Sequence, residues 1–144
     1  MTLSSPLSFQ QLKLENIINY DAQSQQRQSL AAIGQRYTDI VWAAGLFEGE
    51  GSITHAANYP HKKQLSIGMT DKDVMERFVD VVGHGKLYGP YCYKKSGNRK
   101  PYWQWKAYKS SEILRILKMF LPHFGKRRAE KAIEAINHLH ETIN

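Results

Sequence analysis

Two carboxylates, Glu48 and Glu50, end a short segment of the chain in which two glycines lie four residues apart. The segment, residues 42–53, begins like an amphipathic helix, yet Gly45 and Gly49 each lower helix stability by about 1 kcal/mol relative to alanine. A carboxylate near a helix C-terminus costs about 0.3–1 kcal/mol more, because it meets the negative end of the macrodipole. The combination predicts close backbone approach along the helix and an acidic group presented at its tip. A glycine-rich helix end with solvated acids is the alternative.

The residues that follow and precede these acids form a longer pattern. Residues 43–51 read Ala-Ala-Gly-Leu-Phe-Glu-Gly-Glu-Gly, which resembles the LAGLIDADG motif of homing endonucleases with Glu in place of the final Asp. The family continues with a strand, and residues 52–55 fit one. The resemblance spans roughly residues 39–137 and leaves the first 38 or so unexplained. One copy of the motif is present, so the chain resembles the single-motif branch, whose members act as homodimers.

The resemblance implies a site-specific, metal-dependent DNA endonuclease that cuts a long pseudo-palindromic site in double-stranded DNA. In such a dimer the two Glu50 side chains meet at the helix tips, and a divalent cation relieves their repulsion. The implied metal ligands are Glu50 and the backbone carbonyl of Gly49, with Mg²⁺ as the cofactor and Mn²⁺ or Ca²⁺ as substitutes for binding. Glu48 ranks behind Glu50 as a ligand.

Two further catalytic positions are implied by the same resemblance. The family places a basic residue before its final helix near the scissile phosphate. Lys126 is expected at that position here, with Arg127 close behind it. The family also places a polar residue at the end of its second strand, where it orients water. That position is Asp71, which departs from the amide often found there. Asp71 could equally be only the N-cap of the next helix.

The glycines of the motif have a second implied role. A flat stripe of small residues allows another helix to approach closely, and in the family the motif helices form the dimer interface. The interface residues implied here are Ala44, Gly45, Glu48 and Gly49. The alternative is that this stripe packs against other helices of the same chain.

Hydrophobic periodicity and turn residues predict an α+β domain with the order αββαββα, in which helices cover one face of a four-stranded antiparallel sheet. This is also the order of the LAGLIDADG fold. Thr38 or Asp39 is expected to begin the first helix, and Ser110 and Ser111 to cap a later one. The expected helices cover residues 38–50, 72–82, 110–121 and 126–141, and the expected strands cover residues 52–57, 62–70, 85–93 and 101–108, with turns at 58–61 and a basic loop at 94–100.

Alternation along the strands predicts that one sheet face is polar and rich in lysine, amide and hydroxyl groups. A sheet surface of this kind fits the major groove, where such groups can bind base edges. A water-facing sheet surface is the alternative. The basic loop would contact phosphates farther out. The expected DNA-binding residues are Ser52, Thr54, Lys62, Gln64, Ser66, Thr70, Lys86, Tyr88, Lys94, Lys95, Asn98, Arg99, Lys100, Tyr102, Gln104 and Lys106.

Composition agrees with a nucleic-acid partner. The 144 residues carry a net charge of +7, and between residues 81 and 131 there are 13 Lys and Arg residues against two acids. The single cysteine, Cys92, excludes an internal disulfide and suits a reducing intracellular compartment. The sequence shows no membrane-spanning segment, and no small-molecule substrate is expected. Residues 1–37 form a glutamine-rich extension, expected to be helical or partly disordered, before a domain covering residues 38–144.

Three functions remain open at this point. The first is the homodimeric endonuclease described above. The second is a relative that binds nucleic acid without cutting it, such as an RNA maturase or a regulator. The third is an unrelated basic α+β binding module. Retention of Glu50 and of the basic residues 126–128 favours the first.

Overall fold

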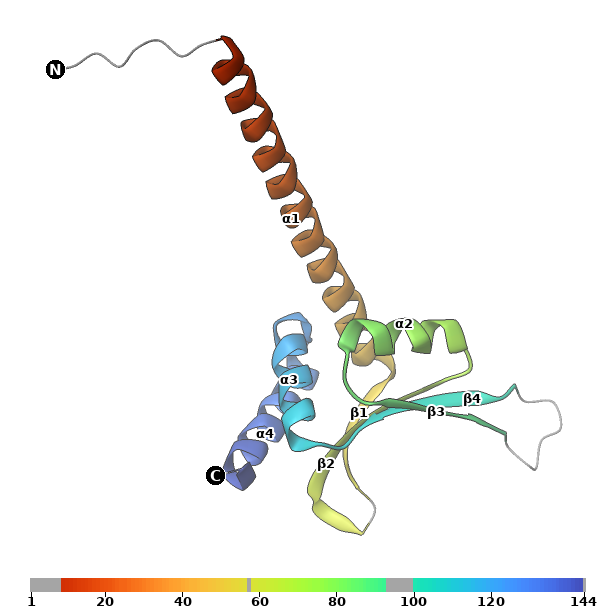
Figure 1. Cartoon of the computed structure of the whole chain (residues 1–144). Helices are drawn as coiled ribbons and strands as arrows, with labels where there is room; N and C mark the ends of the chain where they lie inside the picture. The colour runs from red at the N-terminus through yellow and green to blue at the C-terminus, as the bar shows by residue number, and fades with distance from the viewer. Residues whose placement is uncertain (1–8, 57, 93–99, 144) are drawn as a thin grey trace. The chain divides into compact units, whose positions relative to one another are not determined.

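The structure is a computed structural model that describes residues 9–56, 58–92 and 100–143. The chain divides into two compact units, Met1–Tyr37 and Thr38–Asn144. In the first unit the described residues are helical throughout, which confirms the expected helical N-terminal extension. Figure 1 labels the helices and strands.

Helix α1 (Phe9–Glu50) is one continuous helix of 42 residues. The sequence has no proline from residue 7 to residue 59, so every residue of this stretch keeps the backbone N–H that a helix needs. The predicted start near residue 38 is therefore wrong, because the residues before it continue the same helix. The predicted end at Gly49 or Glu50 is confirmed.

Four strands form the predicted antiparallel sheet, and their order within it is β1-β2-β4-β3 (Figure 1). They are β1 (Gly51–Ala56), β2 (Tyr59–Met69), β3 (Lys86–Tyr91) and β4 (Tyr102–Ala107). Strand β2 begins three residues earlier than predicted, because the turn before it is shorter. Asn58 lies in this turn with φ of 67°, a left-handed conformation that asparagine tolerates.

The remaining helices are α2 (Lys72–Val82), α3 (Ser110–Phe120) and α4 (Lys126–Ile143), with a 3-10 turn η1 (Leu121–His123) between α3 and α4. Helix α2 ends as predicted at Gly83, whose φ of 71° is the left-handed conformation usual at a helix C-terminus. The N-cap of α3 is Lys109, so the prediction that Ser110 and Ser111 cap this helix is wrong.

The hydrophobic core of the second unit lies between the helices and one face of the sheet. Ile67 of β2 pairs with Trp105 of β4, and both side chains are buried. The ring of Phe78 from α2 meets Trp105 edge to face, with centroids 4.9 Å apart. Phe47 of α1 lies 5.9 Å from Phe120 of α3, so the motif helix is fixed by aromatic packing to the same core.

Candidate functional site

The motif part of α1 has two faces with opposite environments. Ala43, Ala44 and Phe47 are fully buried in the core of their own unit. Gly45 and Gly49 are exposed, and a Cβ atom added at either would meet no described atom within 4 Å. The glycine face is therefore open among the described atoms. The alternative of packing within the chain is wrong for Gly45 and Gly49, and it holds for Ala44. The placement of Ala44 in a dimer interface is also wrong, because Ala44 is completely buried within its own chain.

The junction between α1 and β1 leaves no room for a side chain. A Cβ added to Gly51 would lie 2.5 Å from Cδ2 of Phe47 and 2.6 Å from the Phe47 carbonyl oxygen. Gly51 therefore lets the first strand start directly after the last residue of the helix. This close approach sets where the helix tip, with Glu50, lies relative to the sheet.

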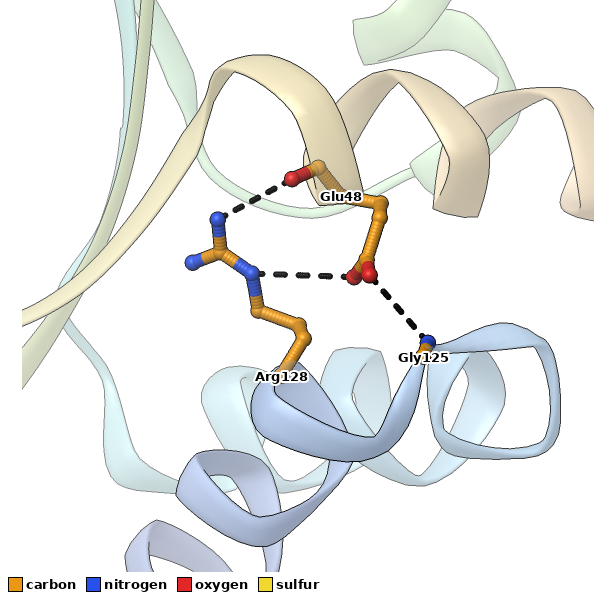
Figure 2. Close-up of polar contacts among 3 residues, drawn as sticks. All are labelled: Glu48, Gly125 and Arg128. Atoms are coloured by element: carbon orange, nitrogen blue, oxygen red, sulfur yellow. Dashed lines mark hydrogen bonds and ion pairs between the residues drawn. The ribbon is translucent and has the colours of Figure 1, made fainter.

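Glu48 joins the last turn of α1 to the start of α4 (Figure 2). Its carboxylate Oε1 accepts a hydrogen bond from the backbone N–H of Gly125 at 3.2 Å, and its backbone carbonyl accepts one from Arg128 Nη2 at 3.1 Å. A carboxylate at the N-terminus of a helix is also favoured by the macrodipole. These contacts hold the tip of α1 against the basic start of α4.

A nearby positive charge offsets the burial of the second carboxylate oxygen of Glu48. Oε2 is buried and makes no hydrogen bond to a described donor, although the side chain as a whole is 38% exposed. It lies 3.7 Å from Arg128 Nε, an ion-pair distance. A buried charged oxygen is costly unless an opposite charge lies nearby, and Arg128 supplies that charge. The carboxylate of Glu48 thus contacts α4 of its own chain, and a place for Glu48 in a dimer interface stays a prediction.

Three of the four predicted catalytic residues lie at the two elements that meet here, α1 and α4. Glu50 is exposed as the last residue of α1, and Lys126 and Arg127 are exposed in the first turn of α4. Arg127 lines a hollow of about 330 Å³ together with Gly51, the residue directly after Glu50, whereas Lys126 does not line it. The structure therefore brings Arg127 to the same hollow as the end of the motif.

Asp71 occupies the N-cap position of α2, as the second interpretation of this residue predicted. Its backbone is extended, with φ of −88° and ψ of 92°, and among the described atoms its side chain makes no capping hydrogen bond. The side chain is exposed. A role for Asp71 in orienting water stays a prediction.

The sheet register brings the predicted DNA-binding side chains together in rows. Ser52, Ser66, Lys106 and Lys86 pair in turn across β1, β2, β4 and β3, so they form one row on the face opposite the core. Neighbouring rows contain Thr54 with Gln64 and Gln104 with Tyr88. Of the remaining predicted residues, Tyr102 is partly exposed and the rest are exposed, namely Lys62, Thr70 and Lys100. The other four, Lys94, Lys95, Asn98 and Arg99, lie outside the described residues.

Tyr91 also lies on this face, which strand alternation did not predict. A shift of register between Tyr88 and Tyr91 places Tyr91 opposite Tyr102, and their ring centroids are 5.4 Å apart. Simple alternation would have turned Tyr91 toward the core. Gly89 and Pro90, residue types that occur in strands mainly at bulges and edges, were the sequence signal for this irregularity.

The oxygen atoms at the tip of α1 suit a hard divalent cation as ligands. The last four carbonyls of a helix have no partner within the helix, so carbonyl oxygens and the Glu50 carboxylate lie at the same end. Among the described residues no cluster of three or more His, Cys, Asp or Glu side chains could hold a metal ion.

The fold is that of the LAGLIDADG homing endonucleases, and the resemblance seen in residues 43–51 is confirmed at this level. Several solved structures of homing endonucleases have a fold similar to that of the chain. No protein-family model and no curated protein matches the sequence. In the part of the chain that the structure describes, no helix has the length and apolar character needed to cross a membrane.

Three of these structures illustrate the similarity. The homing endonuclease I-CvuI, solved with its target in the presence of Ca, is 12% identical with a TM-score of 0.58, covering 76% of this chain and 71% of that chain. The archaeal intron-encoded I-Vdi141I, solved with DNA, is 16% identical with a TM-score of 0.51, covering 72% and 67%. The LAGLIDADG meganuclease I-CpaMI, bound to uncleaved DNA, is 15% identical with a TM-score of 0.54, covering 70% and 35%.

Proposed function

We propose that the chain is a homing endonuclease that hydrolyses phosphodiesters of double-stranded DNA at a specific site. In this proposal it acts as a homodimer on a long pseudo-palindromic site and requires Mg²⁺. The observation that carries the proposal is the position of Glu50. This exposed carboxylate ends the motif helix directly before Gly51, which lines a hollow with Arg127. A carboxylate that can bind a cation and a cationic side chain that can bind a phosphate therefore lie at the same junction.

The second support is the polar sheet face. The row Ser52, Ser66, Lys106 and Lys86 crosses all four strands and is not buried. A surface of hydroxyl, amide and lysine groups suits base edges in the major groove and phosphates on either side. The neighbours I-CvuI and I-Vdi141I were solved with their target or with DNA, which favours the same partner for this chain.

The homodimer is supported by the open glycine face. Because Gly45 and Gly49 have no side chains and no described neighbour at the Cβ position, a second motif helix can approach this face to backbone contact. The chain also covers 35% of the I-CpaMI chain, a share that leaves room for two such domains in that protein. A twofold pair of motif helices would place two Glu50 carboxylates near one axis.

The roles of the chain's own residues follow from this arrangement. Glu50 and the Gly49 carbonyl would hold the cation, and the Glu48 contacts would keep their helix tip fixed. A bound divalent cation supplies Lewis acidity and an activated water for hydrolysis. Arg127 would bind the oxygens of the phosphodiester that is cut, and Lys126, one residue earlier, is the alternative for this role. Electrostatic stabilisation of this kind acts on charge that develops in the transition state.

A library of random duplexes with and without Mg²⁺ tests the proposal. Wild-type protein is expected to select cleavable sites in the presence of Mg²⁺, and Glu50→Gln to bind the selected duplex nearly as well without cutting it. The matched control is Glu130→Gln, which removes an exposed carboxylate of α4 and should cut normally. Cleavage by Glu50→Gln at the wild-type rate would refute the assignment. Binding of RNA without cleavage of DNA would instead favour the maturase-like function.

A further inference from the structure

The hollow beside the junction of α1 and β1 is larger than the space that one cationic catalytic side chain requires. Its volume is about 330 Å³, and it lies between strand β1, at the edge of the sheet, and the first two turns of α4. Four residues of β1 and three residues of α4 line it. The lining residues are Gly51, Ser52, Ile53, Thr54, Arg127, Arg128 and Lys131.

The lining chemistry matches a phosphate group. Among the described residues that line the hollow, three are cationic and none is acidic. Ser52 and Thr54 add two exposed hydroxyl groups, which donate hydrogen bonds to phosphate oxygens readily. Arg128 is already oriented, because its guanidinium binds Glu48 through Nε and Nη2. A side chain held in place in advance loses less entropy when a ligand binds.

The far end of the hollow lies away from the catalytic tip. Thr54 is three residues after Gly51 on a strand, and a strand rises about 3.3 Å per residue, so the two are about 10 Å apart. Lys131 lies four residues after Arg127, about 6 Å farther along α4. A phosphate bound near Thr54 or Lys131 is therefore a different group from one held at Glu50.

We propose that this hollow binds a second backbone phosphodiester of the DNA, next to the one that is cut. Lys131 and the Ser52 and Thr54 hydroxyls make the contacts, beside Arg128, whose charge is paired with Glu48. The inference rests on the proposed function for its ligand, since a phosphodiester reaches the hollow as part of bound DNA. It also changes the role expected of Ser52 and Thr54 from base recognition to phosphate binding.

The salt dependence of binding to a 30-base-pair duplex of random sequence tests the proposal. Each neutralised phosphate contributes a slope of about −0.9 to the plot of log affinity against log salt concentration. Lys131→Ala should reduce the slope by about that amount, because it removes one cationic contact to a phosphate. Lys131→Arg should retain the slope. Thr54→Val should weaken binding severalfold with the slope unchanged, because it removes a hydroxyl and no charge.

Lys118→Ala is the matched control, because Lys118 is exposed on α3 and does not line the hollow. It should leave affinity and slope unchanged. A Lys131→Ala variant with the wild-type slope would overturn the proposal even if cleavage is normal. Wild-type protein that binds no duplex at all would instead refute the proposed function, and with it the DNA ligand.

A titration with inorganic phosphate shows whether the hollow binds a phosphodiester of DNA or free phosphate. Backbone amide resonances of Ser52 and Thr54 should shift on addition of duplex at concentrations where equal inorganic phosphate causes no change. The Lys131→Ala variant should show smaller shifts with duplex. Equal shifts with inorganic phosphate and with duplex would overturn the assignment to a phosphodiester of DNA and indicate a site for free phosphate.

Discussion

Arg128 donates a hydrogen bond to the backbone carbonyl of Glu48 at 3.1 Å, although 80 residues separate them along the chain. Together with the Gly125 N–H bonded to the Glu48 carboxylate, this contact ties the end of α1 to the start of α4. The two elements carry Glu50 and Arg127, the residues proposed for catalysis. A small set of polar contacts thus fixes the distance between two sites that the sequence places far apart.

Arg128→Lys is expected to destabilise the folded chain by about 1–2 kcal/mol. Lysine keeps the charge but cannot bind the Glu48 carbonyl and carboxylate together, because its ammonium lacks the fork of the guanidinium. Urea denaturation measures the loss. Glu76→Gln is the control, since it breaks an exposed pair with Lys72 that is worth about 0.3–0.5 kcal/mol. An equal loss in both variants would show that the Glu48 contacts are no stronger than a surface ion pair.

Gly45→Leu is expected to give a folded monomer. The Cβ position is open within the chain, and leucine favours helix over glycine by about 1 kcal/mol, so the isolated chain should unfold at equal or higher urea concentration. The added side chain should block a second motif helix. Sedimentation velocity measures the assembly state, and Gly45→Ala should weaken the dimer less. A wild-type protein that is monomeric on its DNA would contradict the shared-site mechanism.

Gln104→Ala is expected to relax base preference at matching positions of both half-sites. Gln104 pairs with Gly68 and Tyr88 in the middle of the outer sheet face, and a lost contact to a base edge costs about 1–3 kcal/mol. Selection of cleavable sites from a random library measures the change. Asn137→Ala, an exposed amide of α4, should leave every position unchanged. The outer face would be the wrong DNA surface if Gln104→Ala also left every position unchanged.

Gly51→Ala is expected to destabilise the fold by about 1–3 kcal/mol. The added Cβ would overlap both the ring and the carbonyl of Phe47, and a buried overlap forces the backbone to move. Gly49→Ala is the matched control, because its Cβ meets no described atom and alanine favours the helix. Thermal unfolding of both variants at low protein concentration should show opposite signs. Equal stability of Gly51→Ala and wild type would mean that the helix–strand junction adapts freely.

Much of the fold follows from local sequence alone. Alternating strands, Gly83 after the second predicted helix and Pro122 after the third produced the correct order of elements, because turn residues and periodicity act over a few residues. The polar sheet face was predictable for the same reason. The beginning of α1 was not, since Thr38 and Asp39 are good N-cap residues, and no local pattern shows that the residues before them continue the same helix.

The chain by itself therefore determined the motif, the exposed acid at its end and the order of strands and helices. Tertiary structure decided what depends on contacts between distant residues. It buried Ala44 in the core and left Gly45 exposed, because the elements that pack against a helix decide which of its sides is buried. It joined Glu48 to Arg128 and placed Lys131 beside β1, since no local pattern encodes the distance between two elements that meet only after folding.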